Sequence, residues 1–269
     1  MPARIQRLDA ELIRRGLARS REQASALIAS GRVEVRGVLA TKPASGVDHD
    51  TPIRVQQDDD DPGYASRGGH KLAGALDAFP AIDPAGRRCL DAGASTGGFT
   101  DVLLRRGARE VEAVDVGYGQ LVWALQTDDR VHVHDRTNVR ALTPDDIGGQ
   151  VDMTVADLSF ISLRLVLPAL TACTALAGDL LPMVKPQFEV GKERLGSGGV
   201  VRDPLQRAES VLKVARSAEE LGWLTAGVCA SPLPGPSGNV EFFLWLRDHA
   251  EPGLADDQVA ALVLAAEAG

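Results

Sequence analysis

The spacing of apolar and polar positions changes along the chain and separates strands from helices. Short runs of apolar and β-branched residues predict buried strands, whereas apolar residues three or four positions apart predict helices. From residue 88 onward the two patterns alternate, and Pro204 to Leu221 is the longest helical one. That alternation predicts an α/β fold with a doubly wound, mostly parallel sheet. We expect its strands at 88–91, 111–115, 131–133, 151–156, 180–184, 224–229 and 240–246.

The pattern before residue 60 differs and predicts a small α+β domain. Two short amphipathic segments predict helices that end at Gly16 and Gly31, where the chain must turn left-handed. The second helix is expected to open at Ser20, because Gln23 follows at the spacing of a capping box. Alternating residues then predict strands at 33–37 and 53–55.

Four consecutive aspartates, Asp58 to Asp61, stand between these two patterns. We therefore place a first domain at residues 1–60, a linker at 61–66 and a second domain at 67–269. Before the aspartates, Lys and Arg outnumber Asp and Glu by 10 to 6, and after them the acids outnumber the bases by 27 to 19. The net charge of −8 thus hides a basic head joined to an acidic body.

No segment predicts a membrane span or a disulfide framework. The most apolar stretch, residues 163–184, is broken by Pro168, Gly178, Asp179 and Pro182, whereas a span needs about 20 unbroken apolar residues. It predicts a helix, a turn and a buried strand instead. The N-terminus has no apolar region typical of a secretory signal. The three cysteines are scattered and lack metal-ligand spacing, so we expect free thiols, no metal site and a cytoplasmic location.

The first strand of the body runs into the glycine-rich turn LDAGASTGGF, and a helix follows it. A strand, a glycine turn and a helix form a nucleotide-type cofactor site, because the helix start offers free N–H groups. The next strand ends at Asp115, 18 positions beyond Gly97, about where an acid holds a ribose. A dinucleotide motif would need a glycine at Ser95. The pattern D-x-G-x-x-x-G, from Asp91 to Gly97, is similar to the first motif of class I methyltransferases.

S-adenosylmethionine is therefore favoured over a nicotinamide cofactor, since it has no phosphate to accommodate. Asp135 follows the third strand, where it can meet the adenine or sit in a simple turn. The residues expected to bind the cofactor are Asp91, Gly93, Ala94, Ser95, Thr96, Gly97, Asp115, Asp135 and Asp157.

Charged residues also stand at the ends of other expected strands. Asp157 closes the fourth strand, Lys185 closes the fifth, and Glu241 precedes the last. Lys71 lies ahead of the glycine turn, on the expected first helix of the body. An acid after a strand can simply cap a helix, and a helical lysine can be solvated. Glu241 fits that simpler interpretation least, because it would lie half-buried beside an apolar strand without a partner.

The basic head resembles the S4 RNA-binding domain over RLDAELIRRGLARSREQASALIASGRVEVRG, almost without a gap. The resemblance implies recognition of structured RNA through its shape and backbone. Guanidinium groups suit phosphate oxygens, although a run of charges can also be a solvated face. The arginines that we expect to contact RNA are Arg14, Arg15, Arg19, Arg21, Arg32 and Arg36.

The order Lys71, glycine turn, Asp157, Lys185, Glu241 resembles the K-D-K-E tetrad of FtsJ-like RNA ribose 2′-O-methyltransferases. With the S4-like head, the resemblance narrows to the TlyA family of haemolysin A-like rRNA methyltransferases. The stretches that carry it are SRGGHKL, LDAGASTGGFTDVLL, VADLSFISL, VKPQFEVGK and SPLPGPSGNVEFFLWL. Family members carry a basic and aromatic segment before SRG, but here residues 62–65 are PGYA, which leaves the coupling of the two domains open.

The resemblance implies ribosomal RNA or ribosomal subunits as partner and a cytidine 2′-hydroxyl as target, and we expect a monomer. Lys185 would engage the hydroxyl, since burial and the ammonium of Lys71 favour a neutral lysine while Asp157 and Glu241 favour a charged one. Lys185 can thus act as the base or only steer the hydroxyl. Residues flanking the expected site, with contacts to cofactor or nucleotide, are Phe160, Ser237 and Asn239.

Three other functions stay open on the sequence alone. A haemolysin or other membrane-active protein is named by the family, but no basic amphipathic helix supports it. An RNA-binding module without catalysis is disfavoured by the complete tetrad. A nicotinamide-dependent enzyme is disfavoured by Ser95 in the glycine turn.

Overall fold

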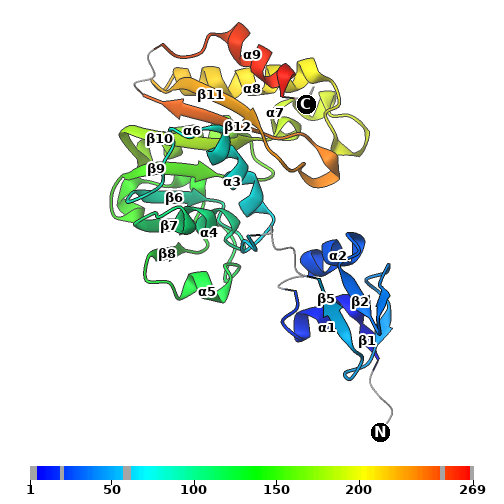
Figure 1. The fold of residues 1–269 in the computed structure, drawn as a ribbon. Coiled ribbons are helices and arrows are strands. Elements are labelled where there is room, and N and C mark those ends of the chain that lie inside the picture. The colour runs from blue at the N-terminus through cyan, green and yellow to red at the C-terminus, as the bar shows by residue number, and fades with distance from the viewer. Residues whose placement is uncertain (1–4, 19–20, 57–61, 249–251, 267–269) are drawn as a thin grey trace. The chain divides into compact units, whose positions relative to one another are not determined.

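The computed structural model describes residues 5–18, 21–56, 62–248 and 252–266. The chain divides into two compact units, Met1–Gly63 and Tyr64–Gly269 (Figure 1). Each unit has a hydrophobic core of its own.

The N-terminal unit packs two helices against short strands, as the sequence pattern predicts. Its helices are α1 (Leu8–Arg14) and α2 (Arg21–Ala29). Gly16 and Gly31 follow them in the left-handed conformation, both with φ of 70°, which favours glycine. The expected helix opening at Ser20 lies outside the described residues. The strands are β1 (Gln6–Arg7), β2 (Val33–Val35), β3 (Val38–Leu39), β4 (Gly46–Val47) and β5 (Ile53–Val55).

The C-terminal unit is built on one seven-stranded sheet with the order β11-β12-β10-β9-β6-β7-β8. Neighbours from β10 to β8 are parallel, and β12 runs antiparallel to both β10 and β11. The prediction of a doubly wound, mostly parallel sheet is therefore confirmed. The strands are β6 (Arg88–Ala92), β7 (Glu110–Val114), β8 (Val131–His134), β9 (Val151–Ala156), β10 (Thr174–Val184), β11 (Leu224–Ala230) and β12 (Phe242–Arg247).

Helices cover both faces of this sheet (Figure 1). One core lies between the sheet and α3 with α4, and the other lies between the sheet and α6, α8 and α9. The helices are α3 (Gly68–Ala78), α4 (Gly98–Arg105), α5 (Trp123–Gln126), α6 (Leu167–Cys173), α7 (Pro186–Glu189), α8 (Pro204–Glu219) and α9 (Asp256–Ala265). Single 3-10 turns are η1 (Val139–Ala141), η2 (Pro144–Ile147), η3 (Leu163–Leu165), η4 (Lys192–Arg194), η5 (Ser197–Gly199) and η6 (Pro236–Gly238).

The turn expected before the fifth strand is absent as such, because β10 starts directly after α6. Its pairing with β9 shifts register between Thr174 and Asp179. Ala177 has a φ of 64° there, and a Cβ on Gly178 would lie 2.8 Å from the carbonyl oxygens of Ala175 and Asp152. The residues that predicted a turn therefore form a bulge inside a longer strand.

Candidate active site

The strand directions bring the expected catalytic residues to one edge of the sheet. Strands β9 and β10 are parallel, so Asp157 and Lys185 follow them at the same edge. Strand β12 is antiparallel, with Val184 opposite Phe242, so Glu241 begins where β10 ends. In open α/β sheets this carboxyl edge is where ligands bind.

Lys185 is buried and paired, which excludes a solvated strand end. Its Nζ lies 2.6 Å from Asp157 Oδ1 and donates to Ser159 Oγ at 2.9 Å. The lysine side chain is 7% exposed and that of Asp157 is 24% exposed. Pro186 starts α7 immediately afterwards, since a proline at the first helical position has no N–H to satisfy. The ammonium therefore faces the edge of the sheet beside a partly accessible carboxylate.

Lys71 and Glu241 form a second acid–base pair at this edge. Lys71 lies on α3, and its Nζ is 2.5 Å from Glu241 Oε2. Glu241 is fully buried, and its Oε1 has no hydrogen-bond partner among the described residues. A Cβ added to Gly235 would lie 2.1 Å from that oxygen, so the backbone of the preceding loop packs on the carboxylate. Glu241 is thus fully buried and paired with Lys71 through Oε2, and the simpler interpretation of a half-buried glutamate without a partner does not hold.

The glycine turn at the end of β6 has the backbone that its sequence suggests. Gly93 and Gly97 have φ values of 91° and 98°, and Ser95 between them has 47°. The space that these glycines leave is filled by protein: a Cβ on Gly93 would lie 2.6 Å from the carbonyl oxygen of Asp157, and one on Gly97 would lie 2.3 Å from Leu125 Cδ1. The turn is thereby locked against the end of β9 and against α5.

The carboxylates that follow β7 and β8 hold loops of the same edge. Asp115 accepts the N–H groups of Ser95 at 2.8 Å and Gly117 at 2.7 Å. Asp135 accepts the N–H of Gly119 at 2.9 Å. Both acids are partly exposed. Since a carboxylate can accept about four hydrogen bonds, each retains acceptor capacity toward a ligand.

Asp91 lies under the glycine turn instead of on its surface. Its side chain is fully buried, Oδ2 accepts the hydroxyl of Thr100 at 2.7 Å, and Oδ1 has no partner among the described residues. Burial raises its pKa to about 7, with smaller contributions from the charges of Asp157 and Asp115, although the Thr100 hydroxyl opposes the shift. Burial thus favours the neutral form of Asp91 over the carboxylate.

Comparison with known proteins shows the family of the chain. The model of the FtsJ-like methyltransferases matches residues 64–248, and the model of the S4 domain matches residues 6–53. The chain belongs to the FtsJ-like methyltransferase family. A relative from Mycobacterium tuberculosis, named 16S/23S rRNA (cytidine-2′-O)-methyltransferase TlyA, is 62% identical over 94% of each chain.

Two further relatives of this methyltransferase have names of another kind. Hemolysin A from Brachyspira hyodysenteriae is 34% identical over 88% of this chain and 97% of its own. A solved structure named "Putative hemolysin from Streptococcus thermophilus" is 36% identical, with a TM-score of 0.79 over 98% of this chain and 96% of that one. The predicted resemblance to the TlyA family is thus confirmed. Relatives of this chain are named either as rRNA methyltransferases or as hemolysins.

The residues expected to flank the methyltransferase site have different surroundings. Phe160 is 91% exposed with a φ of 64°, and its ring centroid lies 5.4 Å from that of Phe188. Ser237 is exposed with a φ of 61°. Asn239 is buried instead, where Oδ1 accepts the N–H of Val201 at 3.1 Å and Nδ2 donates to the carbonyl of Gly199 at 3.0 Å. Asn239 thus ties a glycine-rich loop to the start of β12.

The arginines of the S4 unit divide into two groups. Arg14 and Arg15 both bind the buried Glu11, each at 2.7 Å through Nε, and Arg14 lowers the pKa of that carboxyl to about 2 despite its burial. Arg15 also donates to the carbonyls of Thr51 and His49, so it fixes the chain before β5.

Of the other arginines expected to contact RNA, Arg21 and Arg36 are exposed and Arg32 is partly exposed. Arg36 donates to Thr51 Oγ1 at 3.3 Å, and two-thirds of its side chain is exposed. Arg32 donates through Nε to the carbonyl of Gln56, and Arg21 is exposed at the start of α2. Arg19 lies outside the described residues. The arginines could be predicted from the sequence, but the position of Glu11, which orients Arg14 and Arg15, could not.

The segment before α3 packs against the glycine turn within the same unit. The N–H of Ala65 donates to Asp101 Oδ2 at 2.7 Å, and a Cβ on Gly98 would lie 2.3 Å from Ser66 Oγ. The ring of Tyr64 lies over Gly69 and stacks with the guanidinium of Arg105, 5.1 Å from its centroid. These contacts seat the residues after Gly63 on the start of α4.

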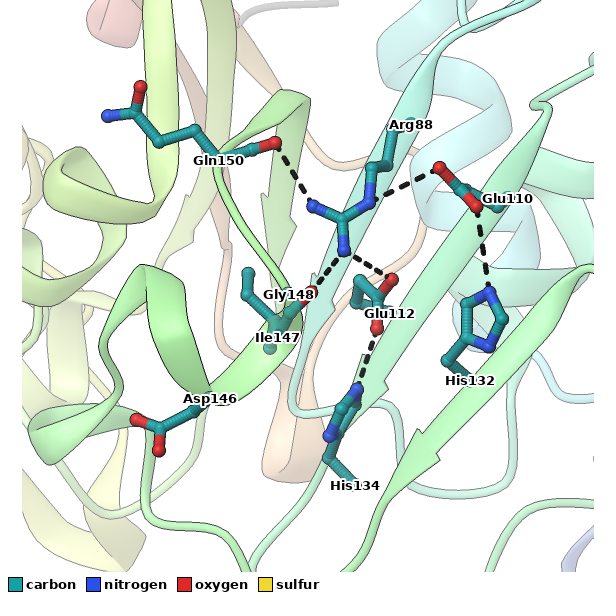
Figure 2. Close-up of a pocket in the computed structure, with 9 residues that line it drawn as sticks. All are labelled: Arg88, Glu110, Glu112, His132, His134, Asp146, Ile147, Gly148 and Gln150. Atoms are coloured by element: carbon teal, nitrogen blue, oxygen red, sulfur yellow. Dashed lines mark hydrogen bonds and ion pairs between the residues drawn. The ribbon is translucent and has the colours of Figure 1, made fainter.

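The pocket of about 620 Å³ in Figure 2 lies away from this site, on one face of strands β6 to β8. Arg88 lies at its centre and contacts Glu112 at 2.7 Å, Glu110 at 3.2 Å and the carbonyl of Gly149 at 2.8 Å. Glu112 also binds His134, at 2.6 Å. These groups bind one another and hold the turn that leads into β9, which assigns the pocket a structural role. Among the described residues, no group of His, Cys, Asp and Glu is placed to hold a metal ion.

Proposed function

We propose that this chain transfers a methyl group from S-adenosylmethionine to the 2′-hydroxyl of a ribose, that of a cytidine, in ribosomal RNA. The observation that carries the proposal is the pair of buried ammonium–carboxylate contacts, Lys185 with Asp157 and Lys71 with Glu241, at the edge that also holds the glycine turn. The name of the 62% identical relative supports cytidine as the target nucleoside and ribosomal RNA as the substrate. A ribosomal RNA substrate supports a cytoplasmic location for the reaction.

The cofactor site suits S-adenosylmethionine, which supplies a methyl group already activated by its sulfonium. Asp115 would accept the ribose hydroxyls, because it ends the strand next to the glycine turn and retains acceptor capacity. Asp135 would face the adenine from the end of β8. The conformation of the glycine turn would be fixed by Asp91, Gly93 and Gly97. The backbone groups that contact the cofactor would come from Ala94, Ser95 and Thr96.

The tetrad would align one hydroxyl and manage one proton. Asp157 and Ser159 hold the ammonium of Lys185, so the lysine can bind the 2′-oxygen in a fixed direction. Holding two reactants in line at about 3 Å removes much of the entropic part of a barrier. As the new C–O bond formed, the C–S bond of the sulfonium would break, and the hydroxyl proton would pass to water or to the neutral amine form of Lys185. Lys71 and Glu241 neutralise each other behind it.

RNA would contact both units of the chain. Phe160, three positions after Asp157, has an exposed ring on which the base of the target nucleotide would stack. Ser237, four positions before Glu241, has an exposed hydroxyl that would bind the RNA. In the S4 unit, Arg14, Arg21, Arg32 and Arg36 would meet phosphates, and Arg15 would support them through Glu11.

The test is transfer of labelled methyl from S-adenosylmethionine to ribosomal RNA and to ribosomal subunits, followed by digestion to nucleosides. Wild type should yield a 2′-O-methylcytidine, and Lys185→Ala should lower the rate by about 100-fold or more, as loss of a positioned acid–base group does. Lys213→Ala, at a partly exposed lysine on α8 that pairs with Glu209, serves as the control. Methyl on a base atom would contradict the proposal, and so would full activity of folded Lys185→Ala.

The relatives named hemolysin favour membrane activity as a second candidate. Among the described residues, no helix has the length and apolar character needed to cross a bilayer. Leakage of a dye from liposomes measures this activity directly. Leakage by wild type and Lys185→Ala alike would identify a second function independent of the tetrad.

A further inference from the structure

Two segments that follow neighbouring strands are joined by three successive side-chain contacts. One segment, residues 157–163, connects β9 to η3, and the other, residues 185–189, follows β10. Lys185 binds Asp157 and Ser159 at one end. The rings of Phe188 and Phe160 meet in the middle. Glu189 makes the third contact, at the far end.

Glu189 holds the far end through two hydrogen bonds. Its Oε2 accepts the hydroxyl of Ser162 at 2.6 Å, and its Oε1 accepts the N–H of Leu163 at 2.7 Å. Leu163 opens η3, so this N–H has no partner within the turn that it starts. Glu189 is 9% exposed, and burial raises its pKa, although the hydrogen bonds from Ser162 and Leu163 oppose the shift. The contact is thus a buried acceptor matched to two donors.

The segment between these contacts is only partly packed against the core. Ser159 and Phe160 are exposed, and Phe160 has a left-handed backbone that disfavours a residue with a side chain. Leu158 and Ile161 are only partly buried against the core. The position of Ser159 and Asp157 beside Lys185 therefore depends on both ends of the segment being held. The β9 end is held by the N–H of Asp157, which donates to the carbonyl of Ala92 at 3.1 Å.

We propose that Glu189 is a positioning residue for Lys185, which acts by fixing segment 157–163 so that Asp157 and Ser159 present their oxygens to the ammonium. This role rests on the proposed function, in which Lys185 engages the 2′-hydroxyl. Loss of the Glu189 acceptor frees Ser162 and Leu163, and the segment then moves away from Lys185. Residues that orient catalytic groups in this way change rates without touching the substrate.

The kinetic test compares Glu189→Ala, Glu189→Gln and Ser162→Ala with the exposed control Glu220→Ala. Glu189→Ala should slow single-turnover methyl transfer by about tenfold, with the affinity for S-adenosylmethionine unchanged. Glu189→Gln should restore most of the rate, because its amide oxygen can accept the Leu163 N–H and its amide N–H can donate to Ser162. Equal rates for Glu189→Ala and wild type would overturn the role.

A double-mutant cycle with Ser159→Ala separates positioning from general stability. If Glu189 acts through the segment that carries Ser159, the double variant should be about as slow as the slower single variant. Rate losses that multiply would show that Glu189 supports the fold elsewhere. Amide hydrogen exchange gives a readout that needs no reaction: in Glu189→Ala, exchange should rise in a peptide covering 157–165 and stay unchanged in β6. Unchanged exchange in 157–165 would also overturn the inference.

The two proposals fail in different ways. Absence of any 2′-O-methyl nucleoside with wild type would reject the proposed function whatever Glu189 does. An active wild type whose rate is insensitive to Glu189→Ala would reject only the positioning role. If Glu189→Ala does not fold, Ser162→Ala removes just one of the two hydrogen bonds and gives the same comparison at lower cost to the core.

Discussion

At the scale of single residues, the surroundings of each carboxylate decide its chemistry. Asp157 is partly accessible and meets an ammonium, whereas Asp91 is fully buried and meets only a neutral hydroxyl. A buried carboxyl without a cation resists ionisation, so its pKa rises. Two aspartates at the ends of neighbouring strands thus behave differently, which no count of acidic residues could show.

The raised pKa of Asp91 predicts a stability change with pH. The folded state retains the proton up to about pH 7, whereas the unfolded chain releases it near its ordinary value, so folding is favoured at low pH and this advantage is lost as pH rises. Asp91→Asn keeps an acceptor for Thr100 and cannot ionise. Relative to wild type, it should gain free energy of unfolding between about pH 5 and about pH 8.

Chemical denaturation at both pH values measures this difference. Asp77→Asn, an exposed acid on α3, is the control, and its effect should stay small at both pH values. A difference between Asp91→Asn and wild type that does not vary with pH would show that Asp91 is ionised in the fold.

At the scale of elements, the strand ends could be predicted from the sequence, but the contacts between them could not. Apolar runs followed by Asp157 and Lys185 indicate a common edge, because parallel strands end together. The partner of Lys71 depends on the antiparallel register of β12 and on the path of α3. Asn239 donates a hydrogen bond to a backbone carbonyl about 40 positions away, and the pattern of side chains does not predict such a contact. Glu189 lies within the quoted stretch VKPQFEVGK, yet nothing local distinguishes it from a solvated helical acid.

Arg88 on β6 predicts an effect on stability that is separate from catalysis. Its guanidinium contacts Glu110, Glu112 and the carbonyl oxygens before β9 (Figure 2), so Arg88→Ala removes the guanidinium partner of buried Glu112 and leaves its contact with His134. Removing one partner of a buried ion pair costs about 3–5 kcal/mol, so the free energy of unfolding should fall by that amount.

The matched control is Arg106→Ala, whose ion pair with Asp77 is exposed and worth about 0–1 kcal/mol. Urea denaturation measures both variants, and methyl transfer by the fraction that remains folded should equal that of wild type. A loss of activity in folded Arg88→Ala would show that the pocket in Figure 2 contributes to the reaction.

At the scale of the whole molecule, charge is divided between the two units. Lys and Arg outnumber Asp and Glu by 10 to 6 over residues 1–57, and the acids prevail after the four aspartates that follow, by 27 to 19. The two acid–base pairs of the candidate active site each sum to zero, so these pairs add no net positive charge to that edge of the sheet. On the proposed function, we therefore expect the attraction for RNA to come mainly from the basic residues 1–57.

Replacing two exposed arginines of that unit should weaken RNA binding alone. Arg21→Ala combined with Arg36→Ala should lower affinity for ribosomal RNA and reduce the slope of log affinity against log salt by about 1 for each lost phosphate contact. Affinity for S-adenosylmethionine should stay unchanged. Filter binding at several salt concentrations measures the slope, with Arg109→Ala in the body as the control. An unchanged slope would place the RNA contacts elsewhere.

The packing of Gly235 on Glu241 predicts that position 235 tolerates no other residue. Any side chain at position 235 would push the carboxylate away from Lys71, because the added carbon would lie 2.1 Å from Oε1. In a library of single substitutions, this position should be depleted as strongly as the lysine itself. Such a library would therefore group Gly235 with the residues of the candidate active site, although glycine contributes only backbone atoms there.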